Sequence, residues 1–125
     1  GVFYTDPTTS KPTFANHYEG SISASDIKAF VADDPYERFE IQSNKATAHA
    51  QSDVFNNFDI EVTAGSTANN VSKSELNHST ATTGTAQLKV TGISTDVENS
   101  TIGAANLNFV VMINEHLYNA KNNGI

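Results

Sequence analysis

The chain has 125 residues, 14 acidic against 7 basic side chains, a formal net charge of −7 and no cysteine. This length fits one domain that buries its own core, and the lack of cysteine excludes disulfides. The negative charge would repel a polyanion, and no apolar run approaches the ~20 residues that span a bilayer, so we expect neither a nucleic-acid nor a membrane partner.

Asn, Ser and Thr together fill 40 of the 125 positions. Their side chains bond to nearby backbone in turns and edges and disfavour helix interiors. The composition therefore indicates β structure with long polar loops.

Residues 1–20 show little periodicity and contain Pro7 and Pro12 among scattered aromatic side chains. Proline imposes extended or turn geometry, so we expect an extended N-terminal arm ahead of a single β domain at residues 21–125. Either the arm packs along its own domain or its side chains dock onto a neighbouring subunit. In the second case the partner-binding residues are Val2, Phe3, Tyr4, Phe14, His17 and Tyr18.

Beyond the arm, alternating apolar and polar residues predict a series of strands. Residues 21–33 suggest one or two short strands, ended by Asp33-Asp34-Pro35. Strands are then expected at residues 36–42, 53–63, 85–93 and 107–113. The last of these is the most apolar, and we expect it at the centre of the fold.

Two segments carry weak helix signals. Residues 43–52 are rich in alanine and predict a short helix capped by Ser43 or Asn44, or else a wide bend. Ser72 and Glu75 have capping-box spacing and predict a single helical turn, whereas residues 64–70, 77–84 and 94–105 are expected to be loops. The predicted fold is all-β: a small antiparallel β-barrel or compact sandwich with one short helix and an extended N-terminal arm.

No residue pattern predicts catalysis or a cofactor. The four histidines (His17, His49, His78 and His116) contain no pair at the i, i+3 or i, i+4 spacing of helical metal ligands, so no zinc site is expected. A nucleophile-elbow serine and the two glycine-rich phosphate motifs are absent as well. We therefore expect a protein that is not an enzyme, with no catalytic, metal-binding or cofactor-binding residues.

Several stretches, in order along the chain, resemble small virion structural proteins of tailed bacteriophages, of the type found in marine phages. They are Tyr4 to Phe14, Asp33-Asp34-Pro35-Tyr36 leading into Phe39-Glu40-Ile41-Gln42, Thr85 to Ile93, and Val111 to His116. The resemblance implies a capsid decoration or cement protein on the outer surface of the virion, with the major capsid protein, and possible further copies of itself, as partners. The chain departs from the family mainly at its start, since the family usually continues further upstream of Gly1, and this leaves the extent of the arm open.

A second hypothesis is a β-rich binding module of a tail, fibre or cell surface that recognises glycans through its long polar loops. Such a module needs a stacking aromatic side chain beside its polar groups. The loops at residues 64–70 and 94–105 contain none, which favours the decoration protein.

Overall fold

The structure, a computed structural model, describes residues 1–119 and 123–124. In that part of the chain every regular element is a β-strand except one 3₁₀ turn, and no helix is of a length and hydropathy that could cross a lipid bilayer. The chain forms two compact units. Unit 1 consists of Gly1–Asp33 and Gly65–Ser72, and unit 2 of Asp34–Ala64 and Lys73–Ile125.

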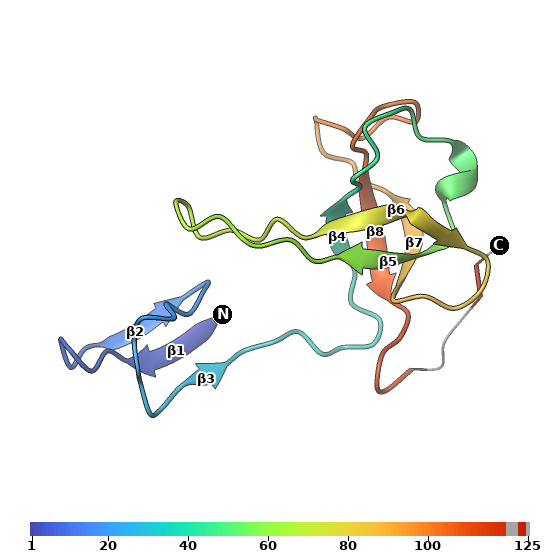
Figure 1. Cartoon of the computed structure of the whole chain (residues 1–125). Helices are drawn as coiled ribbons and strands as arrows, with labels where there is room; N and C mark the ends of the chain where they lie inside the picture. Colours follow the sequence, from blue (N-terminus) through green and yellow to red (C-terminus); the bar gives the residue numbers. More distant parts are fainter. Residues whose placement is uncertain (120–122, 125) are drawn as a thin grey trace. The chain divides into compact units, whose positions relative to one another are not determined.

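Unit 1 contains a three-stranded antiparallel sheet in the order β2-β1-β3 (Figure 1). Its strands are β1 (Val2–Thr5), β2 (Pro12–Ala15) and β3 (Lys28–Ala29). Asp6 makes the turn between the first two: its carboxylate accepts the Thr8 N–H at 2.7 Å and its carbonyl accepts the Ser10 N–H at 2.7 Å. The extended arm expected at residues 1–20 is thus a β-hairpin, because this turn brings the two segments into register.

Unit 2 contains a five-stranded antiparallel sheet in the order β4-β8-β7-β5-β6. The strands are β4 (Phe39–Gln42), β5 (Asn57–Glu61), β6 (Glu75–Thr82), β7 (Leu88–Ile93) and β8 (Asn108–Ile113). The predicted all-β class is confirmed, but a closed barrel is not shown. Ser43, directly after the end strand β4, forms an isolated bridge with Leu76 of the other end strand, β6.

The core of unit 2 comes from the alternating strands that the sequence predicts. Phe58, Leu88, Val90 and the Leu107/Phe109/Val111 series are buried, together with Leu76 of β6. Strand β8 pairs with both β4 and β7, so the segment expected at the centre does lie inside the sheet. Burying a large apolar side chain of this kind contributes about 1.5–3 kcal/mol.

Two expectations about the polar segments are wrong. The short helix expected in residues 43–52 is replaced by extended chain leading into a single 3₁₀ turn, η1 (Gln51–Asp53). The helical turn expected at Ser72–Glu75 is absent, since residues 72–74 have no regular structure, and most of the loop expected at residues 77–84 belongs to β6, the longest of the described strands. Serine and threonine are tolerated there because β6 is an end strand whose ladder runs along β5 on one side, so most of its residues stay partly in contact with solvent.

Candidate functional site

An exposed aromatic face covers one side of the unit 1 sheet. Phe3 pairs with Phe14 across β1 and β2 and with Lys28 across β1 and β3, so these three side chains point to the same side. The ladder continues past β3, since the Phe30 N–H donates to the Gly1 carbonyl at 2.8 Å, and alternation places Phe30 on that side too. The Phe14 and Phe30 rings contact each other with centroids 5.9 Å apart, although 70% and 58% of these residues are exposed.

The opposite side of this sheet carries Val2 and Tyr4, and Tyr4 is buried within the fold. The Tyr4 ring meets that of Tyr18 edge to face, with centroids 5.3 Å apart, and the Tyr18 hydroxyl donates to the Ile22 carbonyl. Tyr18 is half-buried. Of the six residues expected to bind a partner, the structure therefore places Phe3 and Phe14 on the open side and uses Tyr4 and Tyr18 in packing.

His17 lies elsewhere in unit 1, beside a cleft of about 360 Å³. Its Nδ1 is 2.8 Å from the Asn16 side-chain oxygen, and its Nε2 is 3.9 Å from the Glu19 carboxylate. The cleft is lined by Asn16, His17 and residues 65–67 and 70–72, with no phenyl, phenol or indole ring among them. It therefore lacks the stacking platform that a glycan site would need.

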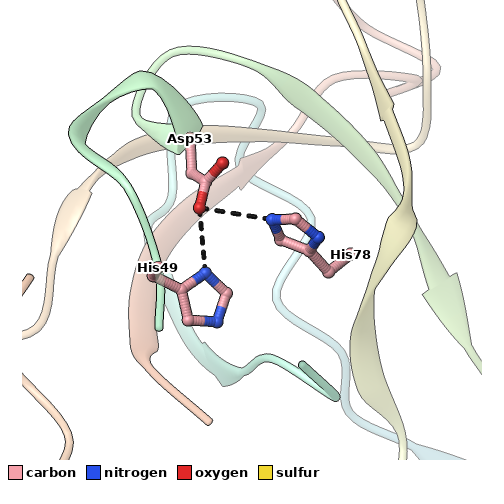
Figure 2. Close-up of side chains that lie close together, drawn as sticks. All are labelled: His49, Asp53 and His78. Atoms are coloured by element: carbon pink, nitrogen blue, oxygen red, sulfur yellow. Dashed lines mark hydrogen bonds and ion pairs between the residues drawn. The ribbon is translucent and has the colours of Figure 1, made fainter. Parts of the chain in front are cut away.

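Unit 2 brings together three ionisable side chains, two from neighbouring positions at η1 and one from the distant strand β6. His49 lies just before η1, Asp53 ends η1, and His78 lies on β6. Figure 2 shows both imidazole rings turned toward one carboxylate oxygen: Asp53 Oδ2 is 3.0 Å from His49 Nδ1 and 3.2 Å from His78 Nε2. The Ala50 N–H donates to the same oxygen at 3.1 Å. We call these three residues the His49–Asp53–His78 cluster.

The cluster is packed against the aromatic core. The His49 ring lies edge to face against the rings of Phe109 and His78, with centroids 5.1 and 5.0 Å apart. The centroids of the His78 and Phe58 rings are 5.8 Å apart. The His49 side chain is fully buried, that of Asp53 is 9% exposed, and that of His78 is 21% exposed. The cluster therefore opens to solvent on the His78 side.

Burial and hydrogen bonds set the charges of two of these groups. Burial is the main reason why the pKa of His49 lies below its ordinary value, in spite of the hydrogen bond to Asp53. Burial alone would raise the pKa of Asp53, but the hydrogen bonds from His49, the Ala50 N–H and His78 outweigh it and hold that pKa below its usual value. Near neutral pH, Asp53 is thus a carboxylate and His49 a neutral imidazole.

A carboxylate can only accept hydrogen bonds, so the single ring proton of His49 must sit on Nδ1 and point at Asp53. His49 Nε2 then carries a lone pair, and it is buried without a hydrogen-bond partner among residues 1–119 and 123–124. Lys45 adds a positive charge at the edge of the cluster, with its Nζ 3.3 Å from His78 Nε2.

Sequence reasoning did not find this cluster because it compared histidines only with one another. His49 and Asp53 do stand at i, i+4, and a search that included carboxylates would have paired them. His78 could not have been added, since its position depends on β6, a strand that the sequence did not predict.

No family model matches the chain, and no curated protein or solved structure matches it either. The function therefore has to be inferred from the chain's own surfaces and side chains. They offer two features: an exposed aromatic face on unit 1 and, in unit 2, a largely buried group of two histidines and one aspartate, residue types that bind metal ions.

Proposed function

We propose that the chain is a non-enzymatic virion structural protein of a tailed bacteriophage, which decorates the outside of the capsid shell and attaches to the major capsid protein through the aromatic face of unit 1. The observation that supports this most is the pair of touching, mostly exposed rings, Phe14 and Phe30. Single exposed apolar residues are ordinary, but adjoining ones on one sheet face are typical of an interaction surface. The sequence resemblance described above points to the same class of protein.

The size of the face fits a weak contact that is repeated many times. A phenylalanine buries about 150–250 Å² when fully covered, so two rings of which more than half is exposed offer roughly 200 Å² to a partner. At about 25 cal/mol per Å² this corresponds to about 5 kcal/mol before the cost of association, which is too little for a stable isolated complex. On a shell that presents many equivalent positions, contacts between neighbouring copies add to this affinity.

The chemistry of the face also favours a protein partner. Lys28 is the charged residue that the strand register places beside Phe3 and Phe14, and the chain as a whole carries a net charge of −7. A nucleic acid would be repelled by this surplus of acidic groups, whereas an apolar patch on another protein would not. Aromatic side chains supply much of the binding energy at protein interfaces.

The test is attachment of purified protein to empty shells of the phage that encodes it, measured by co-sedimentation. We expect the double variant Phe14→Ser/Phe30→Ser to lose attachment by at least about tenfold, because it removes most of the apolar area of the face. The control is Tyr36→Ser, which removes a 73% exposed aromatic side chain from unit 2. It should attach as the unaltered chain does.

Point variants are better suited to this test than a deletion of residues 1–20. That deletion would remove β1 and β2 and leave β3 without its partner strand, so a loss of attachment would have two explanations. Circular dichroism of each variant checks that the sheets remain. Normal occupancy of the shell by the folded double variant would refute the proposal.

A further inference from the structure

We propose that the His49–Asp53–His78 cluster of unit 2 is a binding site for one divalent transition-metal ion, with Zn²⁺ the ion that its donor set suits best. Two imidazole nitrogens and one carboxylate oxygen are common zinc ligands, and three protein ligands leave a fourth position for water. The site is separate from the aromatic face of unit 1, and its existence does not depend on the proposed function.

The spacing of the donor atoms fits such an ion. With metal–ligand bonds of about 2.0–2.1 Å, two ligands of a tetrahedral zinc ion lie about 3.3 Å apart. Asp53 Oδ2 lies 3.0 Å from His49 Nδ1 and 3.2 Å from His78 Nε2, and all three ligand atoms lie within 4.8 Å of one another. Small side-chain rotations would therefore bring all three into coordination.

Hydrogen bonds alone do not satisfy the contacts at His78 Nε2. This nitrogen lies 3.2 Å from the Asp53 carboxylate and 3.3 Å from the Lys45 ammonium. If it carries a proton, the proton suits Asp53 but opposes the Lys45 donor; if it carries a lone pair, the lone pair suits Lys45 but faces the carboxylate. A metal ion between the three ligand atoms removes this conflict, because each of them then offers a lone pair to the ion and the flexible Lys45 side chain can turn toward solvent. The ring proton of His49 moves from Nδ1 to Nε2 on binding, and the ion must outweigh the cost of that buried N–H, which has no partner in the described part of the chain.

The backbone on both sides of the cluster is fixed by hydrogen bonds. The His49 N–H donates to the Ala104 carbonyl at 3.2 Å, and the His49 carbonyl accepts the Gly103 N–H at 3.1 Å. On β6, the His78 N–H donates to the Asn44 side-chain oxygen at 3.0 Å. The ligands are therefore held near their binding positions before any ion arrives, which lowers the cost of binding.

An ion at this site would join η1 to the end strand β6. η1 and β6 are distant in the sequence, since β5 and a long connection separate Asp53 from His78, and only the folded structure brings them together. Because the chain has no cysteine, a disulfide cannot link these two elements, whereas a bound metal ion could. Because the ion would bind the folded chain and not the unfolded one, it should raise the melting temperature.

The experiment is a titration of the EDTA-treated full chain with Co²⁺, followed by displacement with Zn²⁺. We expect one equivalent of Co²⁺ to give the strong visible absorption of a tetrahedral site and Zn²⁺ to abolish it. Changes to outer-sphere partners of metal ligands already weaken binding about 10–100-fold. We therefore expect His78→Gln, which removes a ligand, to weaken binding at least about tenfold.

Two further variants separate this site from adventitious binding and from a purely structural role. His116→Gln removes a histidine outside the cluster and should bind as the unaltered chain does. Lys45→Met removes the ammonium next to the site and should tighten binding by about tenfold, since a positive charge no longer opposes the ion. A network that served structure alone would give no such gain.

The proposal is overturned if the unaltered chain gives no tetrahedral Co²⁺ spectrum at stoichiometric concentrations. It is also overturned if His116→Gln weakens binding as much as His78→Gln, or if Lys45→Met leaves the affinity unchanged or weaker. Should His78→Gln fail to fold, the spectrum of the unaltered chain and the affinity of Lys45→Met still decide the question.

Discussion

Replacing Asp53 by alanine tests whether the cluster contributes to stability in the absence of a metal. The carboxylate is the acceptor for His49, and the His49 side chain is fully buried. In Asp53→Ala the Nε2 tautomer of His49 leaves a buried N–H unpaired, because Nε2 has no partner in the described part of the chain, and the Nδ1 tautomer exchanges a carboxylate acceptor for water at best. A buried unpaired donor costs about 1–3 kcal/mol.

The other two donors to Asp53, His78 and the Ala50 N–H, lose less hydrogen-bond energy in this variant. His78 and the exposed Ala50 backbone can exchange the Asp53 oxygen for water. Removing the carboxylate also removes the cost of having buried it. We therefore expect a loss of about 1–3 kcal/mol in the free energy of unfolding, which for a domain of this size lowers the melting temperature by roughly 5–20 °C.

The assay is urea unfolding followed by circular dichroism, with EDTA present so that no bound ion contributes. Asp59→Ala is the matched control, since from residues 1–119 and 123–124 the Asp59 carboxylate accepts only a long 3.4 Å bond, donated by the Gln87 N–H, and the change should cost less than about 1 kcal/mol. In the double variant His49→Ala/Asp53→Ala the two losses should be less than additive, because both remove the same hydrogen bond. An Asp53→Ala loss below about 0.5 kcal/mol, or no larger than that of Asp59→Ala, would refute the reasoning.

Two further outcomes follow from single residues. The Thr5 N–H and hydroxyl donate to the Asp26 carboxylate at 2.9 and 2.7 Å and hold the pKa of Asp26 below its ordinary value of 3.8. The stability that the ionised Asp26 contributes is therefore complete above this ordinary value and is lost as the pH falls through the lower pKa of the folded state. Thermal melts between about pH 5 and pH 2 should show this loss, and Asp26→Asn should make it smaller; an unchanged slope would contradict the assignment. Phe55 adopts a left-handed backbone with φ 71° and is 47% exposed. Because asparagine tolerates this conformation better than phenylalanine, Phe55→Asn should raise the free energy of unfolding by about 0.5–1 kcal/mol in urea titrations. A destabilised variant would show that packing of the Phe55 ring outweighs the backbone strain.

The core strands could be predicted from the sequence because one face of each is buried. Leu88 and Val90 in β7, and Phe109 and Val111 in β8, alternate with more exposed residues, and this period depends only on the pleat of a strand. In β5 the pattern of the sequence is similar, but the polar Asn57 beside Phe58 is buried as well. Strand β6 could not be predicted in the same way. It contributes one fully buried side chain, Leu76, and is otherwise polar, so it has the composition of a loop until its pairing with β5 is known.

The candidate site was less accessible to sequence reasoning than the fold. The aromatic residues of the first twenty positions stood out, but only the register of β1 with β2 and β3 separates exposed Phe14 from buried Tyr4 and adds Phe30 to the same face. The His49–Asp53 spacing is visible in the sequence. His78, however, lies on β6, with β5 between it and Asp53 along the chain, and the pairing of these strands sets its distance to Asp53. Local patterns carry no information about such contacts.

Unit 1 is discontinuous in sequence, since Gly65–Ser72 belongs to it although this segment lies between two strands of the other unit. Asn16 holds the segment through a bond from its amide to the Asn70 carbonyl, and Ser66 bridges to Val71. The polypeptide consequently crosses from one unit to the other three times. Neither unit can be excised, swapped or fused as a contiguous cassette, and a chimaera that transplants the phenylalanine-bearing hairpin must carry the β5–β6 connection with it.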